Sequence, residues 1–241
     1  VPGEDPVDPL HAWPRKLSET VASLDDPQRV LAYAVNAPFW SDGADKQRKV
    51  VLPAGDARLT VTDGVWELPV GTTVVKSFHG RDRGAQRPLE TRLIERTADG
   101  WLAGTYLWSR DGKEATLVSE GRQFELWNRD TGVSTWHAPS SSECSSCHVE
   151  SQGFVLGLAT AQLDDGSQLE AWAARGLLAD AAGQPLDAAG ARALSASPAL
   201  VDPHDEALDL ASRARSWLDV NCAFCHQPGG PGNATLDLRR R

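Results

Sequence analysis

The chain has 241 residues, of which 41% are hydrophobic and 24% charged, so it can form one large globular domain or two small ones. Its formal net charge of −9 disfavours nucleic acids and anionic membrane surfaces as partners and permits docking to a basic protein. No apolar run approaches the roughly 20 residues that a membrane-spanning helix needs, so no membrane span is expected.

The first part of the chain predicts two short helices and then strands. Residues 1–35 are rich in proline, and helices are expected at 17–24 and 27–34. From residue 36 to about residue 135 the sequence pattern is typical of strands. The run at 74–78, which is β-branched and aromatic, is one example.

Turn sequences between the later runs predict hairpins. Thr97-Ala98-Asp99-Gly100 separates the runs at 89–96 and 101–108, and Asp111-Gly112 precedes another run at 115–118. Consecutive hairpins of this kind predict an antiparallel meander with one half-buried face.

The second part of the chain has helical periodicity. Ser167 is a plausible N-cap of one helix, a short Ala-rich helix is expected within 185–198, and apolar residues recur at spacings of three and four over 205–220. The sequence therefore predicts an α+β fold. Residues 1–138 form a meander or sandwich-like β domain with short leading helices, and residues 139–241 form a helical domain.

All four cysteines lie in two copies of one motif, Cys144-Ser145-Ser146-Cys147-His148 and Cys222-Ala223-Phe224-Cys225-His226. Each copy reads C-x-x-C-H, the attachment site of a c-type haem, in which two thiols bind the porphyrin and the histidine binds iron. The sequence predicts two covalent haems and a cytochrome c-like helical region. The predicted cofactor-binding residues are Cys144, Cys147, His148, Cys222, Cys225 and His226, of which His148 and His226 are the proximal iron ligands.

Other uses of paired cysteines fit this pattern less well. Zinc sites usually have their two cysteine pairs close in sequence, whereas Cys147 and Cys222 are far apart. A thioredoxin-type pair requires a βαβ context that neither motif has. If the cysteines formed two disulfides, the histidine that directly follows each motif's second cysteine would have no explanation.

The second axial ligands cannot be methionine, because the chain contains none. The other histidines are His11, His79, His137 and His204. A helical path from His204 to Cys222 would span about 27 Å, so we assign His204 to the iron of His148. We assign His79 as the second axial ligand of the iron of His226. His137 is the next candidate for either iron. An iron with an open or externally supplied position is the alternative.

Several segments resemble a bacterial family of largely uncharacterised, exported diheme c-type cytochromes, and together they span nearly the whole chain. They are 36–46, 66–72, 75–78, 89–93, 139–140, 143–144, 156–158, 161–163, 213–218, 221–222, 225–230 and 236–238. The resemblance implies an electron carrier. Related sequences continue well past the second motif into a region that can supply a distal ligand, whereas this chain ends at Arg241. We therefore expect either a truncated chain or a ligand from its own histidines or from another chain.

Covalent haem attachment takes place outside the cytoplasm, so a periplasmic or extracellular protein is expected. The polar start at Val1, without an initiator methionine or a signal peptide, suits a processed form. The leading hypothesis is electron transfer between redox proteins, such as other cytochromes or a dehydrogenase, without substrate turnover. The alternatives are a diheme peroxidase-like oxidoreductase with one open haem, and a cytochrome subunit tethered to a dehydrogenase or to an extended assembly, including a homo-oligomer.

Overall fold

The computed structural model divides the chain into two compact units, each built from separated segments. The first unit comprises Val1–Val30, Asp42–Val51 and Gly71–Cys144, and the second comprises Leu31–Ser41, Leu52–Val70 and Ser145–Arg241. Within them the structure describes residues 13–20, 26–62, 65–128, 132–150, 153–163, 167–194, 199–232 and 235–240. The first motif begins in the first unit, because the division falls directly after Cys144.

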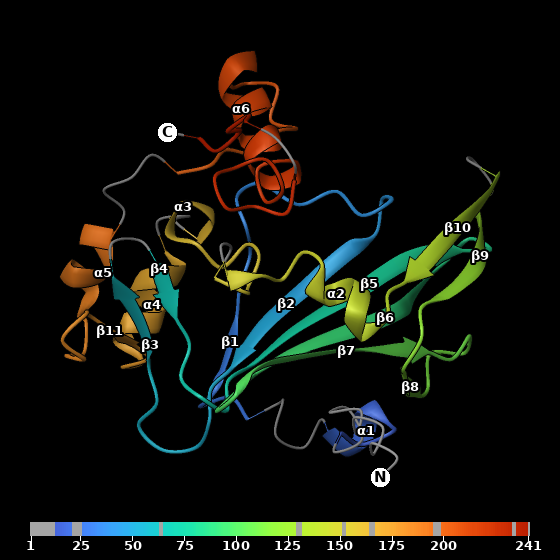
Figure 1. Ribbon diagram of the computed structural model, residues 1–241, viewed down its shortest axis with the longest axis horizontal. Helices are drawn as coiled ribbons and strands as arrows, with labels where there is room; N and C mark the ends of the chain where they lie inside the picture. The colour runs from blue at the N-terminus through green and yellow to red at the C-terminus, as the bar shows by residue number, and fades with distance from the viewer. Residues whose placement is uncertain are drawn as a thin grey trace, which may run out of the picture. The chain divides into compact units, whose positions relative to one another are not determined.

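A six-stranded sheet with the order β1-β2-β5-β6-β7-β8 dominates the first unit (Figure 1). Its strands are β1 (Val30–Ala32), β2 (Asp45–Val51), β5 (Thr73–Asp82), β6 (Ala85–Thr97), β7 (Gly100–Trp108) and β8 (Ala115–Val118). The last four are consecutive neighbours and pair antiparallel, so the predicted meander is present.

Tight turns set the register of this meander. Arg83 and Gly84, which join β5 to β6, have φ values of 53° and 84°, as a two-residue hairpin turn with two left-handed positions requires. Gly100 has a φ of 146° and pairs with Thr97 where β6 turns into β7. A side chain at Gly100 would be strained, so the predicted Asp-Gly turn specifies this hairpin.

One face of the sheet packs against the chain's leading segment. Tyr106 is fully buried, stacks on Trp13 at a centroid distance of 6.4 Å, and donates a hydrogen bond of 2.8 Å to the carbonyl of Pro14. Leu17, the first residue of α1 (Leu17–Thr20), joins the same core with Leu93. On the other face, Phe78 of β5 packs edge-on against Trp136 of a separate antiparallel hairpin, formed by β9 (Arg122–Asn128) and β10 (Gly132–Ala138).

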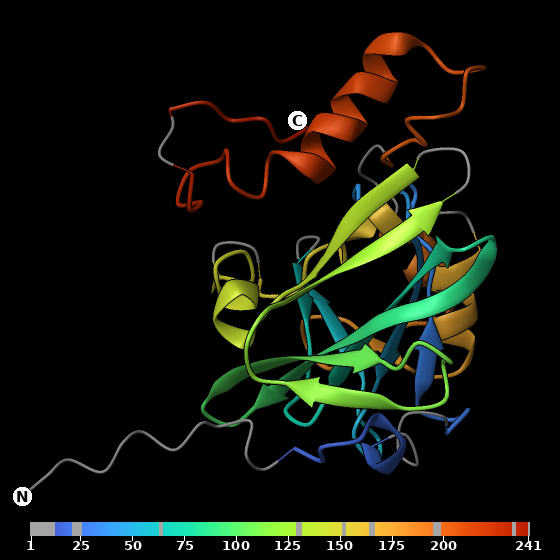
Figure 2. The ribbon, with the colours of Figure 1, turned by 90° about the vertical axis from the view of Figure 1, so that its right-hand side faces the viewer.

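The second unit combines a small sheet with helices. The sheet has the order β11-β3-β4, formed by β11 (Leu178–Ala179), β3 (Leu59–Thr62) and β4 (Val65–Glu67). Its helices are α3 (Thr160–Leu163), α4 (Gln168–Ala174), α5 (Ala188–Leu194) and α6 (Leu210–Asn221), the longest one described (Figure 2). Trp172 of α4 is buried between Tyr33 and Trp66, with edge-to-face contacts to both. Such aromatic packing gives this unit a core of its own.

The sequence prediction of a helix at 27–34 is wrong. Residues 27–29 form a turn and Val30–Ala32 is strand β1 at the edge of the sheet. A helix this short is marginal without tertiary contacts, and pairing with β2 satisfies the backbone of these residues instead. The helix expected at 17–24 is present as α1, and residues 21–25 lie outside the described part of the chain.

The structure is β-rich, with antiparallel sheets and several helices, as the predicted α+β class requires. In the described residues, no helix has both the length and the apolar character needed to cross a membrane.

Candidate functional site

Helix α6 leads directly into the second motif. Its N-cap is Asp209, whose carboxylate accepts a hydrogen bond of 2.9 Å from the backbone N–H of Ser212. At the other end, the Asn221 side chain donates to the carbonyl of Trp217 and accepts from the backbone N–H of Trp40. This helix therefore fixes the direction in which the chain enters Cys222. The helix predicted at 205–220 begins only at Leu210, because Asp209 caps it and the residues before Asp209 form turns.

The second motif folds into one tight turn that follows the helix. The carbonyl of Cys222 accepts hydrogen bonds from the backbone N–H groups of Cys225 (3.1 Å) and His226 (2.9 Å). Residues three apart in such a turn lie on the same side of the chain. Cys222 and Cys225 thus lie on the same side of this turn.

The glycine-rich segment after this motif packs tightly back onto it. The carbonyl of Cys225 accepts a hydrogen bond from Gly232, and that of His226 accepts one from Leu238. A Cβ atom at Gly230 or Gly232 would lie 2.6 Å from the Cys225 carbonyl oxygen, so a side chain at either position would force the backbone apart. The imidazole Nδ1 of His226 is buried and has no hydrogen-bond partner among the described residues. A buried polar atom of this kind requires a partner, which a bound group can supply.

Large apolar side chains lie exposed near this motif. Phe39 contacts Phe224 edge to face at 5.8 Å, and Phe39 is 41% exposed. Trp40 and Trp217 are 58% and 42% exposed, and both lie beside Asn221 through the hydrogen bonds given above. Phe39, Trp40 and Trp217 thus form a small group of exposed aromatic side chains beside the second motif.

A capping box positions the first cysteine of the first motif. The Ser140 hydroxyl accepts from the backbone N–H of Glu143 (3.2 Å), and the Glu143 carboxylate accepts from the backbone N–H of Ser140 (2.8 Å). These reciprocal bonds start helix α2 (Ser141–Ser145), which carries the buried Cys144. The bonds from Ser140 are the main reason why the pKa of the exposed Glu143 carboxyl lies below its usual value.

The histidine of the first motif is oriented by a backbone carbonyl. His148 Nδ1 lies 2.6 Å from the carbonyl oxygen of Phe154, and since a carbonyl only accepts, Nδ1 carries the proton. The neutral imidazole then has its lone pair on Nε2, the arrangement found in metal-binding histidines. Phe154 has a φ of 60° after Gly153, so an unusual backbone turn presents this carbonyl.

The proposed distal ligands lie in different settings. His79 is half-buried in β5, at a β-bulge, and pairs with Asp45 on β2. His204 lies in an exposed turn, where its backbone N–H donates to Asp202. His137 on β10 forms a 2.8 Å contact with Glu143. His11 lies outside the described residues. The assignments of His79 and His204 therefore stay predictions.

A protein-only metal cluster is a different type of site. Within the described ranges, no group of three or more His, Cys, Asp or Glu side chains lies close enough together to hold an ion. A haem does not need such a group, because the porphyrin supplies four of the iron ligands. No disulfide joins the four cysteines, all of which the structure describes.

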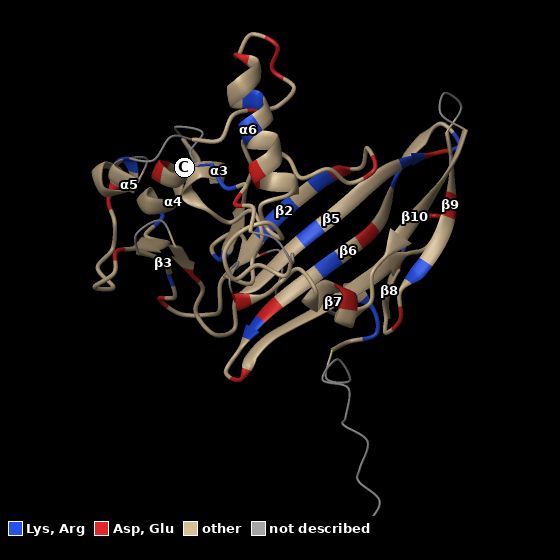
Figure 3. Cartoon of the chain, turned by 45° about the horizontal axis from the view of Figure 1, so that its top comes forward, with Lys and Arg blue, Asp and Glu red and all other residues tan. Residues whose placement is uncertain are grey.

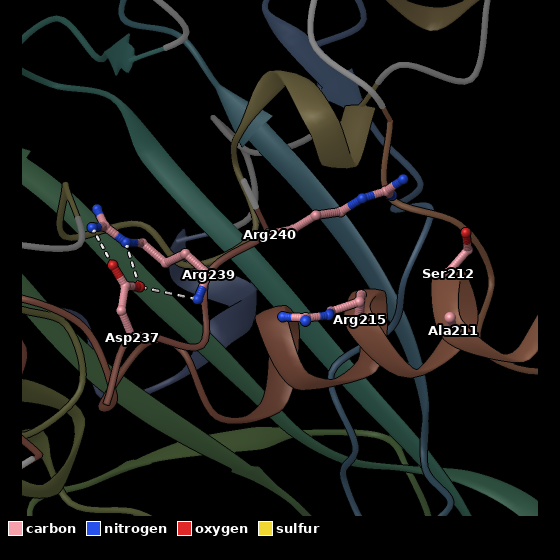
Figure 4. A pocket seen from close by; sticks show the side chains of 6 residues that line it. All are labelled: Ala211, Ser212, Arg215, Asp237, Arg239 and Arg240. Atoms are coloured by element: carbon pink, nitrogen blue, oxygen red, sulfur yellow. Dashed lines mark hydrogen bonds and ion pairs between the residues drawn. The ribbon is translucent and has the colours of Figure 1, made fainter. Parts of the chain in front are cut away.

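A pocket of about 660 Å³ lies along α6 (Figure 4). Its lining residues are Ala211, Ser212, Arg215, Asp237, Arg239 and Arg240. Arg239 forms a two-bond ion pair with Asp237, and the backbone and side chain of Arg240 bind Asp219 and the carbonyl of Ala199. These contacts hold the C-terminal segment against α6, so we interpret the pocket as structural.

Comparison with known proteins leaves the motifs as the main guide to function. No family model matches the chain, and the comparisons with curated proteins and with solved structures found no match.

Proposed function

We propose that the protein is an extracytoplasmic diheme c-type cytochrome that transfers electrons between redox proteins. The observation that carries the proposal is that every cysteine of the chain lies in a C-x-x-C-H motif. The orientation of His148 by a backbone carbonyl and the tight turn at Cys222 support it, because both suit covalent attachment with a neighbouring histidine ligand.

The residues that would hold the two haems follow from the motifs: Cys144, Cys147 and His148 for one, Cys222, Cys225 and His226 for the other. Bound haem supplies an iron that gains and loses one electron reversibly. Phe154 keeps the proton of His148 on Nδ1, and the exposed Phe39 and Trp40 provide an apolar surface beside the second motif. Shielding from water and hydrogen bonds to the ligand are the means by which a protein tunes a redox potential.

The helical segments around α6 are proposed to form a cytochrome c-like region. Its support is local: a capped helix that ends at Asn221, a cysteine turn, and a glycine-rich segment that returns to His226. Export to the periplasm or cell exterior belongs to the same proposal, since c-type haems are attached there.

Denaturing mass spectrometry of protein from cells that mature c-type cytochromes tests the proposal. The expected mass is the polypeptide plus two haems, and a double Cys222→Ala, Cys225→Ala variant should carry one. Thiol titration of the denatured wild type should find no free cysteine. An unmodified polypeptide mass with four titratable thiols would refute the proposal. Two low-spin ferric haems favour a carrier, whereas one high-spin haem would favour a peroxidase-like enzyme.

A further inference from the structure

The sheet face opposite the Tyr106 core carries cations at matching registers. Arg48 on β2 lies directly opposite Lys76 on β5, and Lys76 lies directly opposite Arg92 on β6. Figure 3 shows Lys and Arg segments side by side across these three strands. The next position along this row is Thr105 on β7. We call Arg48, Lys76 and Arg92 the cationic row.

Apolar side chains border the cationic row along the strands. On one side lie Val50, Val74 and Ile94, which pair across β2, β5 and β6 and are buried. On the other side lies the buried Phe78, and the Arg92 guanidinium sits 4.5 Å from the centre of its ring. Lys76 is thus flanked on the same face of β5 by the buried Val74 and Phe78, and a charge beside apolar surface needs a compensating partner.

The positive charges of this face exceed its negative ones. Glu90 is buried and binds Arg92 at 2.6 Å, while Lys46 adds a fourth cation beside Phe78. Among the described residues, no carboxylate forms an ion pair with Lys76, whose two direct neighbours are Arg48 and Arg92. Like charges directly opposite on neighbouring strands are destabilising. Burial, reinforced by the neighbouring cations, lowers the pKa of both Lys46 and Lys76 to about 7.

The first cysteine of the first motif lies at the end of this row. The Ser141 hydroxyl donates a 2.6 Å hydrogen bond to the carbonyl of Ala103, which ties α2 to β7 two residues before Thr105. Cys144 follows Ser141 by one helical turn and so lies on the same side of α2. Burial raises the pKa of the Cys144 thiol, and the nearby Arg92 opposes this shift.

We propose that the cationic row binds the propionate carboxylates of the porphyrin attached through Cys144. The inference rests on the proposed function and adds residues outside the motif to the cofactor site. Propionates are the anionic groups of a porphyrin, and guanidinium and ammonium groups bind carboxylates through charge-assisted hydrogen bonds. A carboxylate at the row also removes the repulsion between Lys76 and its two neighbours.

The test uses the holoprotein and a double Arg48→Gln, Lys76→Gln variant. Arg92 is kept, because it pairs with the buried Glu90. We expect both covalent haems to remain by mass, and the reduction potential of one haem to fall while the other is unchanged. Cations beside the propionates destabilise the ferric haem, which carries one more positive charge than the ferrous haem. Removing these cations therefore stabilises the ferric haem and lowers its reduction potential. The resonance Raman bending bands of one haem's propionates should shift as well.

Lys49→Gln is the matched control, since Lys49 is next to Arg48 on β2 but belongs to the opposite face, across from Val75. It removes one positive charge and should leave both potentials and the Raman bands unchanged. If the double variant is poorly folded, Lys76→Gln alone should show a smaller fall in the same reduction potential and a smaller shift of the same Raman bands.

The outcomes separate this inference from the proposed function. A wild type without covalent haem refutes the proposed function. The inference alone is refuted if both cationic-row variants carry two haems and have the same reduction potentials and propionate bands as Lys49→Gln. Calorimetric binding of free succinate to the wild-type holoprotein, lost in the double variant, would show that the row takes a soluble dicarboxylate and would also refute the inference.

Discussion

Lys76 lies between Arg48 and Arg92 on neighbouring strands, and this position makes its charge sensitive to pH. Its pKa is lowered to about 7 by burial first and then by these arginines and Lys46, while the nearby Cys144 acts in the opposite direction. Between pH 7 and the usual lysine pKa, the unfolded chain holds a proton that the folded chain has released. Stability therefore rises with pH across this window.

We predict that apoprotein lacking haem shows this rise in its free energy of unfolding from pH 7 to pH 10, and that Lys76→Met weakens it. Comparing denaturant unfolding of the two proteins isolates the lysine contribution, because the two chains differ at no other position. Lys49→Met, a charge removal on the opposite face, should keep the wild-type slope. Equal slopes in wild type and Lys76→Met would contradict the prediction.

Helix α6 matters at the next scale, because it positions the second motif through its own caps. Asp209→Ala removes the acceptor for the Ser212 N–H at the start of the helix. We predict a loss of about 1 kcal/mol in the free energy of unfolding of the holoprotein, measured with denaturant. Asp209→Asn retains a side-chain acceptor and should lose much less. If both variants are destabilised equally, the capping bond is not the cause.

The elements that the sequence predicted are those specified by local signals. The hairpin at Asp99-Gly100 and helix α6 depend on a turn type and on periodicity, which a single segment carries. Strand β1 was predicted as helix, and the parallel pair of β11 with β3 was not foreseen, because distant segments determine both. Tertiary pairing overrides weak local preference in such cases.

The candidate site divides in the same way. Both motifs were evident because the two cysteines and the histidine are adjacent in sequence. The bond from His148 to the Phe154 carbonyl was not foreseen, since it depends on a left-handed backbone turn. The cationic row was also missed. Arg48, Lys76 and Arg92 each look like an ordinary polar strand residue until the register places them opposite one another.

At the scale of the whole molecule, the coordination of the two proposed haem irons would decide between an electron carrier and an enzyme. His204 precedes α6 and Cys222 follows it, and the 12 residues of this helix are about 18 Å long. The carbonyl of Pro203 accepts a hydrogen bond from Arg213 near the start of α6, so the neighbouring His204 lies by the N-terminal half of the helix, away from Cys222. His204 shares the second unit with His148. The assignment of His204 to the iron of His148 stays a prediction.

We predict that His204→Ala and His79→Ala each convert one of two low-spin ferric haems to high spin, because each removes a sixth ligand. Optical and electron paramagnetic resonance spectra of the ferric holoprotein measure the change, and mass spectrometry checks that both haems remain. If only His137→Ala changes the spin state, His137 is the sixth ligand instead. This substitution also removes the contact of His137 with Glu143. If all three variants keep the wild-type low-spin bands, the ligand assignment is wrong and the sixth ligands come from elsewhere or from another chain. A wild type that already has one high-spin haem would instead favour an enzyme, since an open iron position can bind a substrate.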